Sequence, residues 1–408
     1  MIGSNMPSRA PRLGRLRSPV LTLGLSLAFA LVVTGCGGPL LANAPAAHPL
    51  VTAAPAPSHP ADPQPVVLPR DDGVHDRLTE WWYYTGHLTD ATGGHWGFEF
   101  VVFRAERGDF AVTWASHLAL TDETGGAFHY AQRSEIGPQV DATAAARASA
   151  GGAAAAFALG IRGLDANDPS TFLRTPWSMA GGGGTDRLAA AALAKESLGD
   201  PVAGFGLALD LAATKPPALH DGDGWVSFGD AGGSYYYSRT AMDAAGTIDI
   251  GGRTLQVTGT AWFDHQWGDF ISLGGGWDWF ALNLDDGTDI TLSLVRAPDG
   301  TYPLVYGTLV DAAGTSSHLA AADFTVTVTR QWTSPVTGAV YPAGWAISIP
   351  GRGLSIDIAP AVAQQELDTR ATTGVVYWEG SQRVTATRDG AALGGQGYVE
   401  LTGYAPGR

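Results

Sequence analysis

The chain has 408 residues, a single cysteine, and 39 acidic against 24 basic side chains, which gives a net charge of −15. A surface of this sign repels nucleic acid and anionic lipid headgroups, so neither is an expected partner. One cysteine excludes an intramolecular disulfide, and the fold must therefore rest on its apolar core.

The first 35 residues have the order of an export signal. Four arginines, the last of them Arg17, precede an apolar run over residues 20–33, which is shorter than the roughly 20 residues of a membrane span. The string VTGC before and at Cys36 resembles the lipobox, where bacteria attach a lipid to the cysteine and cleave before it. We expect a signal peptide over residues 1–35 and an extracytoplasmic lipoprotein held at a membrane by lipidated Cys36. The alternative is an ordinary signal peptide with an incidental cysteine.

Residues 36–70 are rich in Pro and Ala and almost uncharged, a composition that favours extended conformations. We interpret them as a stiff tether. Cleavage after residue 35 would remove four arginines and no acid, and the net charge would change from −15 to −19.

From Glu80 onward the sequence consists of short β-prone runs separated by Gly, Asp and Asn turns, as in EWWYYTGHL, HWGFEFVVFRAE and DITLSLVRAPDG. This spacing is typical of antiparallel sandwiches and barrels, so the predicted class is all-β. Two stretches depart from this alternation of strands and turns. Residues 141–163 are rich in Ala and Gly and contain one possible strand in AAAFALGIRGL, whereas residues 186–197, DRLAAAALAKES, predict one short helix.

About twenty candidate strands are too many to fill one closed barrel but fit two of eight to ten strands each. A weak internal echo supports two units. EWWYYTGHLTDATGGHWGFEFVVFR and WDWFALNLDDGTDITLSLVR both run from an aromatic strand through a polar turn to a strand that ends in Arg. We therefore expect one barrel over residues 71–262 and a second over residues 263–408. Chance likeness between two hairpins is the competing explanation.

The common catalytic signatures are missing: the sequence has no G-x-S-x-G elbow, no H-E-x-x-H, no P-loop and no C-x-x-C. The segment GTAWFDHQWGDF at 259–270 stands out instead. Strand alternation puts His265 and Trp267 on one face, and Asp264 and Gln266 on the other. A histidine beside a tryptophan could deliver a proton near an aromatic surface that stabilises a cation. A histidine that only makes a hydrogen bond within the wall is the alternative.

The first half of the sequence contains further candidate site residues. Glu80, Trp82 and Tyr84 share one strand face, with Trp81 and Tyr83 on the other, and in GGSYYYSRT Tyr236 faces away from Tyr235 and Tyr237. Glu99 lies within the apolar run FEFVVF, and a buried carboxylate needs a partner or a raised pKa, so we expect an Arg or His beside it. His117 is a lone histidine between apolar neighbours, which is more often structural than catalytic.

Taken together, EWWYYTGHL, GFEFVVFRAE, SHLALTDETGGAFHYAQR, SYYYSRT, VTGTAWFDHQWGDF and GWDWFALNLDDGTDITLSLVR resemble the family of hydroxyneurosporene synthase, or carotenoid 1,2-hydratase, and its AttH-like secreted relatives. The resemblance extends from about Asp71 to Tyr404. It implies two consecutive lipocalin-like β-barrels. Many bacterial relatives are described only as predicted secreted hydrolases.

In the hydratase branch the resemblance implies addition of water to a terminal C=C bond of an isoprenoid chain. An acid protonates the alkene, aromatic faces shelter the carbocation, and water adds, with no metal and no redox cofactor. The H-x-W pair of that family maps onto His265 and Trp267. Its Tyr-x-Asp pair has no clear counterpart here, and Asp285 and Asp289 are only loose candidates for the acid.

We therefore expect a lipocalin-like protein that takes an elongated apolar ligand, isoprenoid or lipid-like, between its two barrels. The predicted catalytic residues are His265, Asp264 and Trp267, with Asp264 orienting the imidazole through a neighbour. The predicted ligand-binding residues are Trp82, Glu99, His117, Tyr236 and Trp279. Two alternatives stay open: a carrier without turnover, in which DHQWG joins the barrels, and hydrolysis of a lipid ester.

Overall fold

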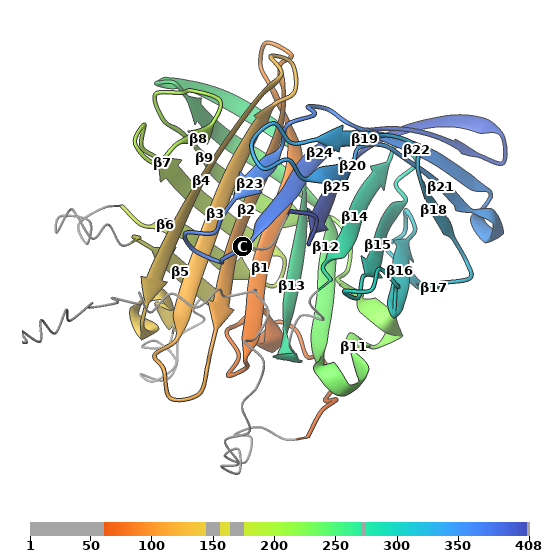
Figure 1. Cartoon of the computed structure of the whole chain (residues 1–408), viewed down its shortest axis with the longest axis horizontal. Helices are drawn as coiled ribbons and strands as arrows, with labels where there is room; N and C mark the ends of the chain where they lie inside the picture. The colour runs from red at the N-terminus through yellow and green to blue at the C-terminus, as the bar shows by residue number, and fades with distance from the viewer. Residues whose placement is uncertain (1–60, 144–155, 164–174, 271–274, 406–408) are drawn as a thin grey trace, which may run out of the picture. The chain divides into compact units, whose positions relative to one another are not determined.

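The computed structural model describes residues 61–143, 156–163, 175–270 and 275–405 (Figure 1). These residues all belong to one compact unit, 38–408. The predicted signal peptide, Cys36 and most of the predicted tether lie outside the described residues.

The first sheet contains every strand from residue 79 to residue 270. Its main path follows the order β5-β6-β7-β9-β12-β13-β1-β2-β3-β4-β8, and β10 and β11 pair with β12. All pairings are antiparallel, and the sheet curls around an aromatic core (Figure 1). Its strands are β1 (Thr79–Asp90), β2 (His95–Ala105), β3 (Thr113–Asp122), β4 (Ala127–Ile136), β5 (Phe157–Ile161), β6 (Trp177–Gly182), β7 (Thr185–Ala192), β8 (Leu198–Gly199), β9 (Phe205–Ala213), β10 (Ala218–Leu219), β11 (Trp225–Ser227), β12 (Gly232–Ile250) and β13 (Arg253–Phe270).

The second sheet follows the order β17-β16-β15-β14-β25-β24-β22-β21-β18, with β23 paired to β24; the two-stranded sheet β19-β20 is not hydrogen-bonded to it but packs Tyr341 into the same core. The second sheet encloses its own apolar core, built around Phe280, Trp345 and Trp378. Its strands are β14 (Trp277–Leu284), β15 (Asp289–Val295), β16 (Leu304–Val310), β17 (Ser316–Ala320), β18 (Thr325–Val328), β21 (Trp345–Ile349), β22 (Leu354–Pro360), β23 (Glu366–Asp368), β24 (Val376–Arg388) and β25 (Ala391–Thr402); the separate pair is β19 (Gln331–Thr333) and β20 (Val340–Pro342).

The predicted all-β class is confirmed, and the two curled antiparallel sheets are consistent with the two barrels that were expected. Within the described ranges the helical elements are short 3-10 turns: η1 (Arg70–Asp72), η2 (Pro138–Val140), η4 (His220–Gly222), η5 (Gly229–Ala231) and η6 (Pro350–Arg352). No helix in the described part of the chain is long and apolar enough to cross a membrane.

The two halves of the internal echo occupy equivalent places in the two sheets. EWWYYTGHL and HWGFEFVVFR form the hairpin β1-β2. WDWFALNL and DITLSLV form the hairpin β14-β15. In each sheet the first strand of that hairpin also pairs with the last long strand, β13 in the first sheet and β25 in the second. The expected barrel boundary between residues 262 and 263 lies inside β13, and the chain passes to the second sheet only after Phe270.

The helix predicted over residues 186–197 is wrong. Residues Thr185–Ala192 form β7, which pairs with β6 and β9, and its side chains alternate strictly between the core and the outside. Alanine favours a helix in isolation, but propensities of a few tenths of a kcal/mol per residue are overridden when a strand can bury Leu188, Ala190 and Ala192. The possible strand in AAAFALGIRGL is confirmed as β5.

Candidate functional site

The residues predicted from DHQWG separate onto the two faces of β13. His265 and Trp267 face the core enclosed by the first sheet, whereas Asp264 and Gln266 face the other way. The predicted alternation is confirmed, and so are the faces predicted for β1 and for the three tyrosines of β12. The prediction that His265 and Trp267 lie between the two sheets is wrong, because alternation defines two faces but not which of them meets the second sheet.

His265 is fully buried inside the first sheet. Its Nε2 lies 3.0 Å from Oε1 of Glu80, and its ring stacks on Trp82 at 4.7 Å between ring centroids. Burial lowers the pKa of His265. Asp264 is on the opposite face and does not orient this imidazole; Glu80 holds it instead. Trp82, predicted to bind ligand, likewise packs within this inner core.

A second group of polar residues lies between the sheets. On the first sheet, the strand register sets Ser238, Asp264, Tyr83, Val101 and His117 side by side across β12, β13, β1, β2 and β3. On the second sheet it aligns Trp279, Glu400 and Glu379 across β14, β25 and β24. Hydrogen bonds from Tyr83 to Glu379 and from Trp279 to Tyr236 join the two sheets. We call this region the inter-sheet layer.

Two fully buried carboxyl groups of the layer each have one oxygen without a partner. Tyr83 donates to Oε1 of Glu379 at 2.7 Å, and Tyr377 donates to Oε1 of Glu99 at 2.9 Å. Oε2 of both glutamates is buried and makes no hydrogen bond. Burial raises the pKa of Glu99 to about 8, and it raises that of Glu379 well above its ordinary value, because ionising Glu379 beside the carboxyl groups of Glu400 and Glu99 is also unfavourable. Both groups therefore hold a proton at neutral pH.

Two further acids surround this pair. Burial raises the pKa of Glu400 to about 7, and Trp277 donates a hydrogen bond to it at 3.0 Å. Burial also raises the pKa of Asp264 to about 6, although Ser238, Tyr236 and Trp262 all donate hydrogen bonds to its carboxylate. Burial thus raises the pKa of all four acids, an arrangement that can provide proton donors near neutral pH.

Aromatic rings supply the apolar part of the layer. Tyr83 and Trp262 from the first sheet contact Trp279 from the second, with centroid separations of 5.3 and 6.2 Å, and Tyr398 packs into the same cluster. Rings of this kind present faces that stabilise a nearby positive charge. The predicted ligand-binding residues Tyr236 and Trp279 are both in this layer.

Glu99 lacks the Arg or His neighbour expected for it. Its carboxyl group instead contacts Tyr377, whose hydroxyl also shares a 2.7 Å hydrogen bond with Nδ1 of His117. His117 therefore reaches Glu99 only through a phenol that comes from the second sheet. Burial lowers the pKa of His117 to about 3, so this imidazole is neutral and supplies no counter-charge.

A pocket of about 230 Å³ lies at one edge of the layer. Its lining comes from both sheets and includes His87, Glu123, Gln382, Arg383 and Gln396. The ring of His87 contacts that of Tyr398 at 5.4 Å between centroids, and its Nε2 donates to the carbonyl of Gly397 at 2.9 Å. Tyr398 therefore contacts a lining residue of this pocket and also belongs to the aromatic cluster of the inter-sheet layer.

A profile of the AttH-like family matches residues 59–404. The chain belongs to the AttH-like family. A crystal structure described as an AttH from Nitrosomonas europaea is 31% identical, covers 85% of this chain and 100% of its own, and superposes with a TM-score of 0.68. Kievitone hydratase from Nectria haematococca has the same fold at 15% identity, with a TM-score of 0.59 over 83% of this chain and 93% of its own. No protein of curated function matches the sequence.

Neither loose candidate for the acid of this AttH-like protein joins the four carboxyl groups described above, although Asp289 also lies between the sheets. Asp285 is exposed in the turn after β14. Asp289 is buried, but its carboxylate accepts hydrogen bonds from Lys215, Thr240 and Asn283, all at 2.6 to 2.7 Å. A carboxylate that is already paired in this way has no free oxygen or proton to offer a ligand.

Ser238 bears on the hydrolase alternative. Its hydroxyl donates to Asp264 and shares a 2.7 Å hydrogen bond with Nε2 of His220, whose other nitrogen contacts Thr308. A nucleophilic serine gives its proton to a histidine, which a carboxylate then orients. Here the serine stands between the other two groups and its proton is directed to the acid, so this trio does not have the geometry of an esterase.

Sequence reasoning missed Glu379, Glu400, Tyr377 and Tyr398. The signal was present, because YWEG and YVEL each place one glutamate inside an apolar strand, as FEFVVF does for Glu99. A charged residue in such a run has to be paired or neutral once the strand is buried on both faces.

Proposed function

We propose that this AttH-like protein adds water to, or removes water from, a C=C bond of an elongated apolar ligand held between its two sheets. The observation that carries the proposal is the pair of buried carboxyl groups, Glu379 and Glu99, each with an unpartnered oxygen beside the aromatic cluster of the layer; burial raises the pKa of both. Kievitone hydratase, which shares the fold, supports the reaction class as an analogy.

Glu379 is the proposed proton donor. Its Oε2 proton passes to one alkene carbon, and the C=C π electrons form the new C–H bond and leave a cation on the other carbon. Trp279, Trp262 and Tyr83 shelter that cation. A water molecule then bonds to it and gives up one proton to the Glu379 carboxylate, which restores the acid. The reverse sequence eliminates water.

The ligand enters at the pocket lined by His87 and Arg383. A pocket of about 230 Å³ is smaller than the roughly 300 Å³ at which sites for drug-sized ligands begin, so a long ligand has to extend beyond it. The adjacent layer is closely packed, with Tyr83 and Tyr398 under a tenth exposed. We infer that Tyr398 moves aside to admit the chain of the ligand.

The test begins with the full-length protein extracted from membranes and mass spectrometry of the apolar compounds that copurify with it. The recovered compound is then incubated with fresh protein in ¹⁸O-labelled water. Wild type should incorporate one labelled oxygen, and Glu379→Gln should be slower by at least about 100-fold, as expected for loss of a general acid.

Asp186→Asn is the matched control. Asp186 is another buried acid with a pKa raised by burial, to about 6, but it lies inside the first sheet and should not affect the rate. Equal rates in wild type and Glu379→Gln would contradict the assignment of the acid. A compound that binds in stoichiometric amount but is never labelled would establish the carrier function instead.

The chain's export remains a separate proposal. The charged and apolar order of residues 1–35 and the VTGC string support an extracytoplasmic lipoprotein attached to a membrane through Cys36. An apolar ligand taken from a membrane would suit such a location.

A further inference from the structure

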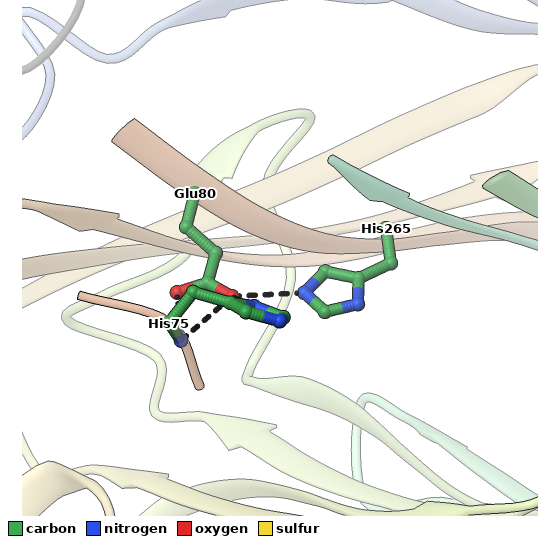
Figure 2. Close-up of side chains that lie close together, drawn as sticks. All are labelled: His75, Glu80 and His265. Carbon is green, nitrogen blue, oxygen red and sulfur yellow. Dashed lines mark hydrogen bonds and ion pairs between the residues drawn. The ribbon is translucent and has the colours of Figure 1, made fainter. Parts of the chain in front are cut away.

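We propose that His75, Glu80 and His265 form a binding site for a divalent transition-metal cation, with Zn²⁺ as the best fit. The site lies on the inner face of the first sheet, on the side of β13 opposite the inter-sheet layer, so the proposal is independent of the hydration chemistry. Figure 2 shows the Glu80 carboxylate close to His75 and joined by a dashed line to the ring of His265.

The ligand atoms converge on one point. Nδ1 of His75 lies 2.7 Å and Nε2 of His265 lies 3.0 Å from Oε1 of Glu80, and the three ligand atoms all lie within 4.8 Å of one another (Figure 2). Tetrahedral zinc bonds of 2.0 to 2.2 Å place neighbouring ligand atoms about 3.3 Å apart. Small side-chain shifts would therefore accommodate the ion.

The surroundings resemble the outer shell of a metal site. Nε2 of His75 lies 3.7 Å from Oδ1 of Asp71, so the nitrogen that does not face Glu80 has a carboxylate beside it. Metal-bound histidines commonly direct their second nitrogen to such a group. The backbone N–H of His75 also donates to Oε2 of Glu80 at 3.0 Å, which turns Oε1 toward both rings.

Charge favours a cation here. Oε1 of Glu80 contacts both imidazoles and the His75 backbone N–H, so two rings compete for one carboxylate oxygen. A divalent ion bound to two neutral imidazoles and the Glu80 carboxylate would carry one residual positive charge; the nearby Asp71 carboxylate, which also pairs with Arg70, lies on the His75 side of the cluster. Nitrogen and oxygen donors in this mixture suit zinc better than calcium or magnesium.

The rings are rigidly held and partly accessible. His75 stacks on Trp267 at 4.1 Å between centroids with an interplanar angle of 3°, and His265 stacks on Trp82. His75 retains 19% exposure of its side chain, which offers an entry path from solvent, whereas Glu80 and His265 are fully buried. The ion would fasten the segment before β1 to β13.

The test uses the full-length protein, stripped with a chelator and titrated with Zn²⁺ by calorimetry. One equivalent should bind with a dissociation constant of about 1 μM or lower. His75→Gln alters the most accessible ligand and should weaken binding at least about 100-fold, and Asp71→Asn should weaken it about 10-fold. Circular dichroism of each variant establishes that it is folded.

His87→Gln is the matched control, because His87 also contacts a carboxylate, Glu123 at 3.0 Å, outside the cluster. It should bind Zn²⁺ as wild type does, and Zn²⁺ should raise the unfolding temperature of both but not of His75→Gln. The proposal is overturned if wild type binds no Zn²⁺ tighter than about 100 μM, or if folded His75→Gln and Asp71→Asn both keep the wild-type affinity.

Discussion

At the scale of single residues, burial raises the pKa of the carboxyl groups in the inter-sheet layer. A glutamate whose pKa in the folded state is raised from 4.5 to about 8, as for Glu99, keeps a proton that the unfolded chain releases. Between those two pH values the folded state binds more protons than the unfolded state. Stability is therefore lost as the pH rises through that window.

Glu99→Gln should remove part of this pH dependence. From pH 4.5 to pH 7 the wild type should lose stability relative to the variant, with an upper bound of roughly 3 kcal/mol. Urea unfolding at several pH values measures the difference. Asp186→Asn should change the pH dependence of stability only up to about pH 6, because burial raises the pKa of that carboxyl to about 6. Parallel stability curves for wild type and Glu99→Gln would show that Glu99 is ionised in the folded protein.

The sequence predicted which face of a strand each side chain occupies, but not which residues that side chain contacts. Alternation correctly separated Asp264 from His265 and Tyr236 from Tyr237. Which face of β13 meets the second sheet depends on how the two sheets pack against each other, and no local pattern records that. Tyr377 and Glu379 therefore entered the site only from the structure.

At the scale of elements, β7 shows why the predicted helix failed. Its sequence, TDRLAAAA, is helix-prone, but its register against β9 brings every second side chain into the core. The hairpins β1-β2 and β14-β15, in contrast, were predictable, because polar turns separate runs with strong β propensity on both sides.

Adjacent alanines of β7 provide a test of that register. Ala190 is buried and Ala191 is exposed. Ala190→Lys should lower the free energy of unfolding by more than about 3 kcal/mol, because it buries an unpaired charge. Ala191→Lys should change it by less than about 0.5 kcal/mol. Denaturant unfolding of the two variants is the measurement, and similar losses at both positions would contradict the alternation.

At the scale of the whole molecule, the sequence predicted two β units from strand number and an internal echo, and the two antiparallel sheets confirm this organisation. The inter-sheet layer is a property of their packing. Its hydrogen bonds join residues nearly three hundred positions apart, as from Tyr83 to Glu379. The AttH-like family profile spans both sheets, consistent with a site that needs each of them.

The proposed lipid anchor at Cys36 is tested on the full-length chain. Cys36→Ser should leave the protein unlipidated and shift it from the membrane fraction to the soluble fraction after cell lysis. Labelling with a radioactive fatty acid, followed by fractionation, measures both effects. Ser8→Ala, in the segment ahead of the apolar run, serves as the control. A Cys36→Ser protein that stays in the membrane fraction would contradict the lipoprotein assignment.

The protonation state of Glu379 and Glu99 at neutral pH tests the central claim most directly. Infrared spectroscopy distinguishes the C=O stretch of a protonated carboxyl group from the bands of a carboxylate. Difference spectra of wild type against Glu379→Gln and against Glu99→Gln at pH 7 should each show the loss of one protonated carboxyl band, and the Glu99 band should fade as the pH rises through about 8. Difference spectra that show the loss of carboxylate bands instead would mean that both groups are ionised. Glu379 and Glu99 could then not donate a proton to a ligand.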